Sequence, residues 1–304
     1  MKPFLWPQPS GYSFSHYWKA VHVQQVIAIL FRLGKICAIL LGVFTISVYA
    51  AGSLEAIFHS NILPQFLKGL FSLFFILCAG YLMNDLCDIT YDLKNAPEKV
   101  FIGNIIAIAA AKYTAVALLT VGLAVSIFVN IWYVGIIIIV SIWLAAYNLF
   151  SKKLGMLKDM MISLIVISIY PLSLALTSGG NQSPRRSSLL IFPIWLFLTI
   201  MAYEIIRDIM DAPGDGLAIR SSVPLKGNSH KSRKTALLLA FLGLPFALLP
   251  FVFKMCGPLY LWGFLGAAVV LCCAVFLRTE LLSKALFLEI LLITVASLLD
   301  IAIA

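Results

Sequence analysis

Two short clusters of aspartate stand out in a chain that otherwise carries little charge. They hold six of the 13 acidic residues in 304, and they are Asp85, Asp88, Asp92, Asp208, Asp211 and Asp215. Both clusters have the spacing i, i+3, i+7, which on an α-helix holds three carboxylates within roughly 60° of one face. Crowded carboxylates are unfavourable unless cations neutralise them, and their oxygen atoms suit hard divalent cations. The spacing therefore predicts a divalent-cation site formed by two facing clusters.

The rest of the chain has the composition of a polytopic membrane protein. Apolar residues make up 62% and charged residues 12%, and the mean hydropathy is +1.02. This excludes a soluble Rossmann or barrel enzyme. The six cysteines fall mostly in apolar segments without zinc-like pairing and are interpreted as small core residues. The net charge of +9 reflects membrane topology rather than nucleic-acid binding, so we expect no nucleic-acid partner.

Nine apolar stretches are long enough to cross a bilayer, which takes about 20 residues each. They are residues 33–51, 65–83, 102–128, 131–150, 157–178, 189–207, 235–253, 257–277 and 283–303. The predicted fold is all-α, with about nine transmembrane helices in a single domain, residues 1–304. Residues 1–32 form its N-terminal segment, in which residues 16–31 have the pattern of an interfacial amphipathic helix.

Positive charges predict the orientation in the membrane. With the N-terminus inside, sixteen lysines and arginines fall on the inner side and three, Arg185, Arg186 and Lys254, on the outer side. This favours a cytoplasmic N-terminus, and it places both aspartate clusters at the cytoplasmic ends of spans two and six. The N-terminus shows no removable signal peptide and no recognisable transit peptide, which favours a prokaryotic plasma membrane.

The clusters predict a substrate that carries a diphosphate, because Mg²⁺ bound by aspartates usually takes further ligands from substrate phosphates. A solvated helix end is the alternative, but it does not predict two copies of one spacing on one side of the membrane. Cations near the clusters would stabilise charge on a leaving diphosphate. Arg207 and Lys153 are the preferred candidates, since ordinary positive-inside residues are the alternative for each. The others are Lys94, Lys99, Lys152, Arg220 and Lys226.

These segments resemble the signatures of the UbiA superfamily of intramembrane prenyltransferases. NDLCDITYD is similar to NDxxDxxxD, and the following KNAPEK is similar to the N-x-P-E-R stretch. EIIRDIMDAPGD resembles the second signature, and SSVPLKG resembles the T-L-P-x-x-x-G that often follows it. Tyr147, in AAYNLFSKKLG, lies where the family commonly has a Tyr-Ser before a basic residue.

The resemblance implies a helical bundle around a central cavity whose cytoplasmic mouth binds a prenyl diphosphate through two Mg²⁺ ions. The allylic C–O bond would ionise, and a lipophilic or aromatic acceptor would capture the carbocation. The implied metal ligands are Asp85, Asp88, Asp92, Asp208, Asp211 and Asp215. The implied diphosphate ligands are Asn84, Lys94, Lys99, Lys152 and Arg220, and the implied catalytic residues are Tyr147, Lys153 and Arg207. Tyr147 would shield the cation with its π-face, with a structural tyrosine as the alternative.

The chain also departs from the family pattern, mainly around the acceptor. Arg-Pro near the first span is here Arg32-Leu33, Val100 replaces a proline, and Asp159 lies where asparagine is commoner. Lys99 stands where arginine is usual, so it keeps the charge but loses bidentate geometry. The second signature is more similar to branches that alkylate glycerol-phosphate lipids, homogentisate or chlorophyllide than to the 4-hydroxybenzoate branch.

Two alternatives to a prenyltransferase remain at this point. A membrane terpene cyclase would use the same metal site but let the carbocation attack its own chain. A cation transporter would use intramembrane carboxylates as a path. Against it, only Lys112, Glu289 and Asp300 fall clearly within other spans, which gives no continuous polar route.

Overall fold

The regular elements of the structure are all helices. This computed structural model describes residues 14–58, 62–95, 102, 107–150, 154–177, 184–211 and 229–303. Its elements are α1 (Phe14–Ala51), α2 (Leu54–Phe58), α3 (Ile62–Asn95), α4 (Ile108–Ile127), α5 (Ile131–Phe150), α6 (Met156–Ile167), α7 (Ile169–Leu176), the 3₁₀ helix η3 (Pro184–Leu190), α8 (Phe192–Asp211), α9 (Ser229–Val252), α10 (Pro258–Ala274) and α11 (Thr279–Ile303).

Eight segments of the described chain are long and apolar enough to cross a membrane, with α6 and α7 together forming one of them. The ninth expected span corresponds to α10, which at 17 residues is shorter than the others. Large apolar side chains such as Tyr113, Trp132 and Trp262 are exposed on α4, α5 and α10. Such surfaces suit lipid, and the predicted all-α polytopic fold is confirmed.

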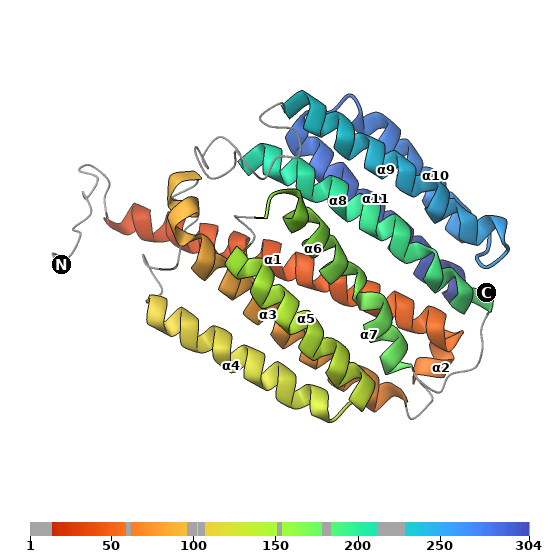
Figure 1. The fold of residues 1–304 in the computed structure, drawn as a ribbon, viewed down its shortest axis with the longest axis horizontal. Helices are drawn as coiled ribbons and strands as arrows, with labels where there is room; N and C mark the ends of the chain where they lie inside the picture. The colour runs from red at the N-terminus through yellow and green to blue at the C-terminus, as the bar shows by residue number, and fades with distance from the viewer. Residues whose placement is uncertain are drawn as a thin grey trace.

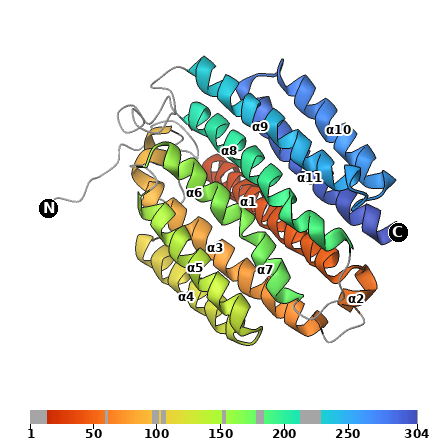
Figure 2. The same cartoon turned by 45° about the vertical axis from the view of Figure 1, so that its right-hand side comes forward.

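The helices form two groups with α1 between them (Figures 1 and 2). One group contains α3 to α7, with α4 packed on α3 and α5. The other contains α8 to α11, with α10 packed on α11 and α9. The groups meet where α6 contacts α8 and where α1 contacts both α7 and α11. This arrangement brings the ends of α3, α6 and α8 together, and these ends carry most of the charged residues discussed below.

α1 is longer than the predicted first span. The sequence suggests a separate interfacial helix over residues 16–31, but the structure has one continuous helix from Phe14 to Ala51. Residues 14–33 contain neither glycine nor proline, so nothing in their backbone chemistry ends the helix before the apolar span begins.

The span formed by α6 and α7 is broken at Ser168. Pro171 lies three residues beyond the break, where it has no N–H to donate to the carbonyl of Ile167 and its ring crowds that carbonyl. The Ser168 hydroxyl donates to Ile165 O at 2.6 Å. Because of this break, α7 runs on as a second short helix whose Tyr170 is buried against α1 and α8.

Candidate active site

A large cavity runs through the bundle between the two groups of helices. Its volume is about 1190 Å³, and its walls come from α1, α3, α5, α6, α7, α8, η3 and α11. One end reaches the surface, because Asp211 lines the cavity and is exposed; we call this end the mouth. The other end is closed by Tyr49, Leu189 and Phe192, which are 1%, 4% and 5% exposed; we call it the floor.

Five of the six predicted aspartates line the cavity at its mouth. Asp85, Asp88 and Asp92 of α3 line the cavity, and so do Asp208 and Asp211 of α8. The i, i+3, i+7 spacing gives this result because it holds each set on the helix face that borders the cavity. The sequence therefore predicts the convergence of two clusters from distant parts of the chain on one chamber.

The amide of Asn84 supports the first cluster. Its Nδ2 donates to Asp88 Oδ2 at 3.1 Å, and Asn84 itself lines the cavity. This bond orients the Asp88 carboxylate at the cavity wall.

The second cluster contains cations as well as acids. Lys158 of α6 donates from Nζ to Asp208 Oδ1, and the same Nζ lies 3.8 Å from Asp159 Oδ1. Arg207 Nη1 lies 3.7 Å from Glu204 Oε1 one turn earlier on α8. Lys158, Asp159, Glu204, Arg207 and Asp208 form the mouth cluster. Asp159, Glu204 and Asp208 are buried, so the cations offset what would otherwise be costly repulsion.

The remaining predicted residues are only partly described. Tyr147 of α5 and Arg207 both line the cavity. The backbone of Lys94 lies in the last turn of α3, but its side chain is outside the described part. Outside the described residues altogether are Lys99, Lys152, Lys153, Asp215 and Arg220. The roles of all these residues stay predictions.

Sequence reasoning missed two charged residues of the site, Lys158 and Glu204, and the aromatic Tyr203, all of which line the cavity. In the sequence, Lys158 is one of the sixteen positive residues of the predicted inner side. Glu204 could have been found, because it lies one helical turn before Asp208 and extends the acidic row of α8 backwards at the same face.

The carboxylates at the mouth fit a magnesium site in their chemistry. They offer only oxygen atoms, and Asp208 Oδ2 is buried and accepts no hydrogen bond from any residue the structure describes. No three acidic, histidine or cysteine side chains of the described ranges converge on one metal position. In proteins Mg²⁺ is usually held by one or two carboxylates and completes its shell with water and substrate phosphate.

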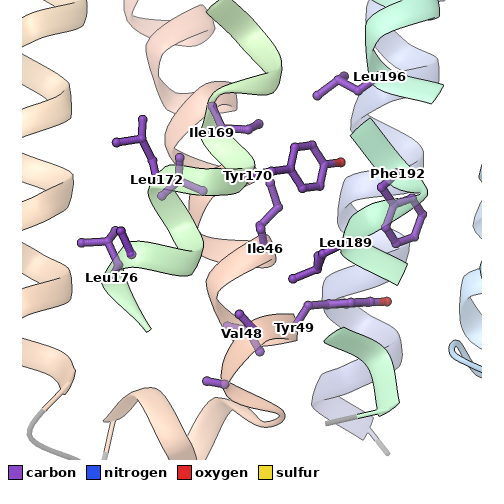
Figure 3. Close-up of a cluster of buried hydrophobic side chains, with 14 of the residues drawn as sticks. Ile46, Val48, Tyr49, Ile169, Tyr170, Leu172, Leu176, Leu189, Phe192 and Leu196 are labelled. Atoms are coloured by element: carbon purple, nitrogen blue, oxygen red, sulfur yellow. The ribbon is translucent and has the colours of Figure 1, made fainter. Parts of the chain in front are cut away.

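Apolar and aromatic side chains line the rest of the cavity toward the floor. Figure 3 shows Tyr170 of α7 and Tyr49 of α1 extending toward Leu189 and Phe192. The α1 wall runs from Lys35 near the mouth to Tyr49 at the floor, a rise of about 21 Å for 14 residues at about 1.5 Å each. The cavity is therefore deep enough to cross most of an apolar membrane core.

Trp195, another residue of the wall, is held by a buried acid. Its Nε1 donates to Glu289 Oε1 at 3.0 Å, and Thr199 Oγ1 is 3.5 Å from the same oxygen. Glu289 lies on α11 behind the wall and is fully buried. This bond fixes the indole edge so that the ring forms part of the apolar lining.

Behind the floor, a second group of polar residues joins α1, η3 and α11 to the loop between α9 and α10. Arg185 of η3 forms an ion pair with Asp300 of α11 at 2.6 Å, and its guanidinium lies 5.7 Å from the centre of the Tyr49 ring. The Tyr49 hydroxyl is 3.6 Å from Cys256 Sγ. Tyr49, Arg185, Cys256 and Asp300 form the floor cluster. Burial raises the pKa of the Cys256 thiol to about 11, so this thiol is neutral at physiological pH.

The geometry just described can be compared with known proteins. The sequence model of the UbiA prenyltransferase family matches residues 40–287. The chain belongs to this family. Membership confirms the prediction that the protein is a prenyltransferase and an integral membrane protein, because the matched residues contain both aspartate clusters and most of the predicted spans.

Relatives of this UbiA protein include two archaeal enzymes named digeranylgeranylglyceryl phosphate synthase. The Methanocaldococcus jannaschii enzyme is 27% identical over 219 residues, which is 71% of this chain and 75% of the relative. The Saccharolobus solfataricus enzyme is 29% identical over 177 residues, 58% of this chain and 61% of the relative.

Solved structures have the same fold. A structure of a digeranylgeranylglyceryl phosphate synthase superposes with a TM-score of 0.68 at 23% identity, covering 90% of this chain and 96% of the other. A UbiA homologue from Archaeoglobus fulgidus, bound to geranyl diphosphate and Mg²⁺, gives a TM-score of 0.63 at 16% identity over 89% of this chain and 98% of the other. The helical bundle is therefore that of the UbiA enzymes.

Proposed function

We propose that this UbiA protein catalyses the Mg²⁺-dependent transfer of a prenyl group from an isoprenoid diphosphate to a lipophilic acceptor, with release of diphosphate. One observation carries the proposal. Two acidic clusters, from α3 and α8, line the mouth of a single deep cavity whose walls and floor are apolar. Such a chamber matches a substrate with a strongly anionic head and a long hydrocarbon tail.

The roles of the head-group residues follow from their chemistry. The aspartates of the two clusters, with Asp215, hold Mg²⁺, which neutralises charge on the departing diphosphate when it is bound. Diphosphate oxygens are bound by cations and one amide: Asn84, Lys94, Lys99, Lys152, Lys153, Arg207 and Arg220. The described members of this set that line the cavity, Asn84 and Arg207, lie at the mouth beside the carboxylates.

The walls of the cavity govern what happens to the allylic cation. As the C–O bond to diphosphate breaks, positive charge develops on the first carbon of the tail. Tyr147 and Tyr203 line the cavity and offer aromatic faces that stabilise such a cation. The apolar lining keeps water away from the cation, so that the acceptor forms the new bond instead.

The acceptor is a glycerol-phosphate lipid, and the tail is geranylgeranyl. Support comes from the relatives, which are named digeranylgeranylglyceryl phosphate synthase. The depth of the cavity agrees with this tail. An extended isoprene unit spans four carbon–carbon bonds of about 1.5 Å and is about 5 Å long. The length of four units therefore matches the cavity depth of about 21 Å that follows from the helix rise.

The mouth faces the cytoplasm of a prokaryotic cell. The distribution of positive charges along the sequence supports this orientation, since sixteen lysines and arginines fall in segments predicted to lie on the inner side, with the aspartate clusters, and three in segments predicted to lie outside. The archaeal source of the relatives supports a prokaryotic membrane. Diphosphates are water-soluble head groups, so a mouth open to the cytoplasm gives them direct access.

The test is release of diphosphate by the purified protein in lipid nanodiscs. Geranyl, farnesyl and geranylgeranyl diphosphates are supplied with and without Mg²⁺, and with and without geranylgeranylglyceryl phosphate as acceptor. Organic extracts are analysed by mass spectrometry. We expect release to require Mg²⁺ and acceptor, to be fastest with geranylgeranyl diphosphate, and to yield an ether-linked adduct of both tails.

Each alternative outcome has a distinct meaning. Mg²⁺-dependent release that gives a cyclised hydrocarbon without acceptor would replace this proposal with a terpene cyclase. An adduct with an aromatic acceptor from a membrane extract, but none with the glycerol lipid, would keep the transferase and change the acceptor. No release from any of the three diphosphates would overturn the proposal.

A further inference from the structure

Lys158 occupies an unusual position among the charged residues of the mouth. It lies in the first turn of α6, and its Nζ bonds Asp208 of α8 while also facing Asp159 beside it. The Lys158 side chain is 14% exposed, and the side chains of Asp208 and Asp159 are 8% and 0% exposed. The ammonium group therefore lies between two buried carboxylates, at the cavity wall and next to a predicted metal ligand.

The acids around Lys158 have more acceptor capacity than the structure uses. Asp208 Oδ2 and both carboxylate oxygens of Asp159 accept no hydrogen bond from a described residue. With Glu204 there are three acids and two cations in the mouth cluster. Buried carboxylate oxygens without donors are costly, so this arrangement has room for a further positive charge.

We propose that Lys158 is a movable counter-ion that pairs with Asp208 before substrate binds and turns to the substrate diphosphate when Mg²⁺ takes its place. This inference rests on the proposed function. A lysine suits the role because its ammonium is a compact charge on a flexible four-carbon stem with three donors. Both Lys158 and Asp208 line the cavity, so the exchange needs only a side-chain rotation within the chamber.

The exchange couples metal binding to diphosphate binding. Mg²⁺ alone must displace the ammonium from Asp208 and leave it with fewer anionic contacts. When diphosphate arrives with the metal, it offers the displaced ammonium new anionic oxygens. Each ligand therefore strengthens binding of the other, and by thermodynamic linkage the two enhancements are equal. The device makes the metal site assemble mainly around substrate.

The test measures metal binding rather than turnover. Protein in zwitterionic nanodiscs is dialysed to equilibrium against Mn²⁺, at fixed free Mn²⁺, with and without inorganic diphosphate. In the wild type we expect diphosphate to raise the Mn²⁺ affinity by about tenfold or more, within the usual range of coupling. In Lys158→Met we expect Mn²⁺ alone to bind about tenfold more tightly and the diphosphate enhancement to fall by a similar factor.

The matched control is Lys284→Met, which removes the same charge from the mouth end of α11 at an exposed position outside the cavity lining. It should behave as the wild type. A second variant, Lys158→Met with Asp159→Asn, removes one charge of each sign and keeps the test valid if the single variant folds poorly. It should show the same loss of coupling.

Unchanged Mn²⁺ affinity and unchanged enhancement in both Lys158 variants would overturn the inference while the proposed function stands. A different result would overturn the proposed function itself: the wild type binds no Mn²⁺ in either condition and releases no diphosphate from prenyl substrates.

Discussion

The protein has a buried ion pair at each end of its cavity, and the two pairs differ in how completely they are satisfied. At the floor, Asp300 accepts from Arg185 at 2.6 Å and from the backbone N–H groups of Gly257 at 2.7 Å and Tyr260 at 3.4 Å. At the mouth, Asp208 accepts from Lys158 on one oxygen, and its other oxygen has no donor among the described residues.

The two pairs also differ in what they face. Arg185 and Asp300 are not part of the cavity lining, and they tie η3 and α11 to the start of α10. Lys158 and Asp208 line the cavity. A satisfied pair behind the wall acts on the fold, whereas an unsatisfied pair on the wall is available to a ligand. Burial alone therefore does not separate structural charges from functional ones, but hydrogen-bond completeness and cavity contact together do.

The largest expected effect comes from the aspartates of the mouth. Asp85→Ala or Asp211→Ala should lower the rate of diphosphate release by about 1000-fold or more, about 4 kcal/mol in the barrier, because a metal ligand is lost. Thermal unfolding of the Asp211 variant should change little, since Asp211 is exposed. The control is Glu280→Ala, an exposed acid at the mouth end of α11. Undiminished turnover in either variant would remove the metal mechanism.

At the floor pair, a substitution should lower stability and leave turnover nearly unchanged. Asp300→Ala removes the carboxylate that pairs with the Arg185 guanidinium and accepts from two backbone N–H groups, so the free energy of unfolding should fall by about 3 kcal/mol. Turnover per folded molecule should stay near that of the wild type. Thermal unfolding in detergent measures the first quantity and diphosphate release the second.

A double variant at the floor tests whether the loss of stability comes from the unbalanced charge. Arg185→Met with Asp300→Leu removes both charges and should be less destabilising than Asp300→Ala alone, because no guanidinium charge then stays in a buried site that has lost its carboxylate. Stability near the wild type with lost turnover in Asp300→Ala would instead make the floor pair functional, and the contrast between the two ends would disappear.

Cys256 reports whether the floor is closed. Its pKa of about 11 leaves about a thousandth of the thiol ionised at pH 8, compared with roughly a quarter for an ordinary thiol. Maleimide should therefore label Cys256 at least about 100-fold more slowly than a free thiol, measured by peptide mass spectrometry. The rate should rise about tenfold per pH unit up to pH 11, because only the thiolate reacts. Asp300→Ala should accelerate labelling, and equal rates in both proteins would contradict a role of Asp300 in closing the floor.

Features of the fold and the site that depend on residues close together in the chain could be predicted from the sequence. The apolar spans follow from composition, and the aspartate clusters follow from spacing within one helix. Pro171 marks the break at Ser168 by local chemistry. Glu204 continues the acidic row of α8 by one turn and was missed although the pattern contained it.

The ion pairs could not be predicted, because they join residues far apart in the chain. Lys158 and Asp208 are 50 residues apart and Arg185 and Asp300 are 115 apart. Three of them fit an ordinary explanation, Lys158 as a positive-inside lysine, Arg185 as a loop arginine and Asp300 as an isolated acid in a span, and Asp208 is predicted only as a metal ligand. Only the packing of α6 on α8, and of η3 on α11, decides which charge meets which.

Glu289 is a further buried acid, and it lies behind the wall between the two ends of the cavity. It lies outside the lining, and its Oε2 accepts no hydrogen bond within the described chain. Glu289→Leu leaves the Trp195 N–H without its acceptor, so stability should fall by about 2 kcal/mol. Glu289→Gln keeps the Oε1 acceptor and should cost less than about 0.5 kcal/mol.

Tryptophan fluorescence gives a second measurement of the Glu289 variants. A shift in Glu289→Leu that Glu289→Gln reverses would show that the bond positions the Trp195 ring. Equal stability of the two variants would show that the bond contributes nothing to the wall.

The smallest effect is expected at Cys87, which lies between two predicted metal ligands, Asp85 and Asp88. A thiol is a soft ligand and Mg²⁺ prefers oxygen, so the residue should contribute no ligand despite its position. Cys87→Ser should keep turnover within about twofold of the wild type, with the same dependence on Mg²⁺ concentration. A changed metal dependence, measured as the Mg²⁺ concentration for half-maximal diphosphate release, would place sulfur in the site. It would then show that nearness to the acidic cluster, rather than an unsatisfied oxygen facing the cavity, marks a functional residue at the mouth.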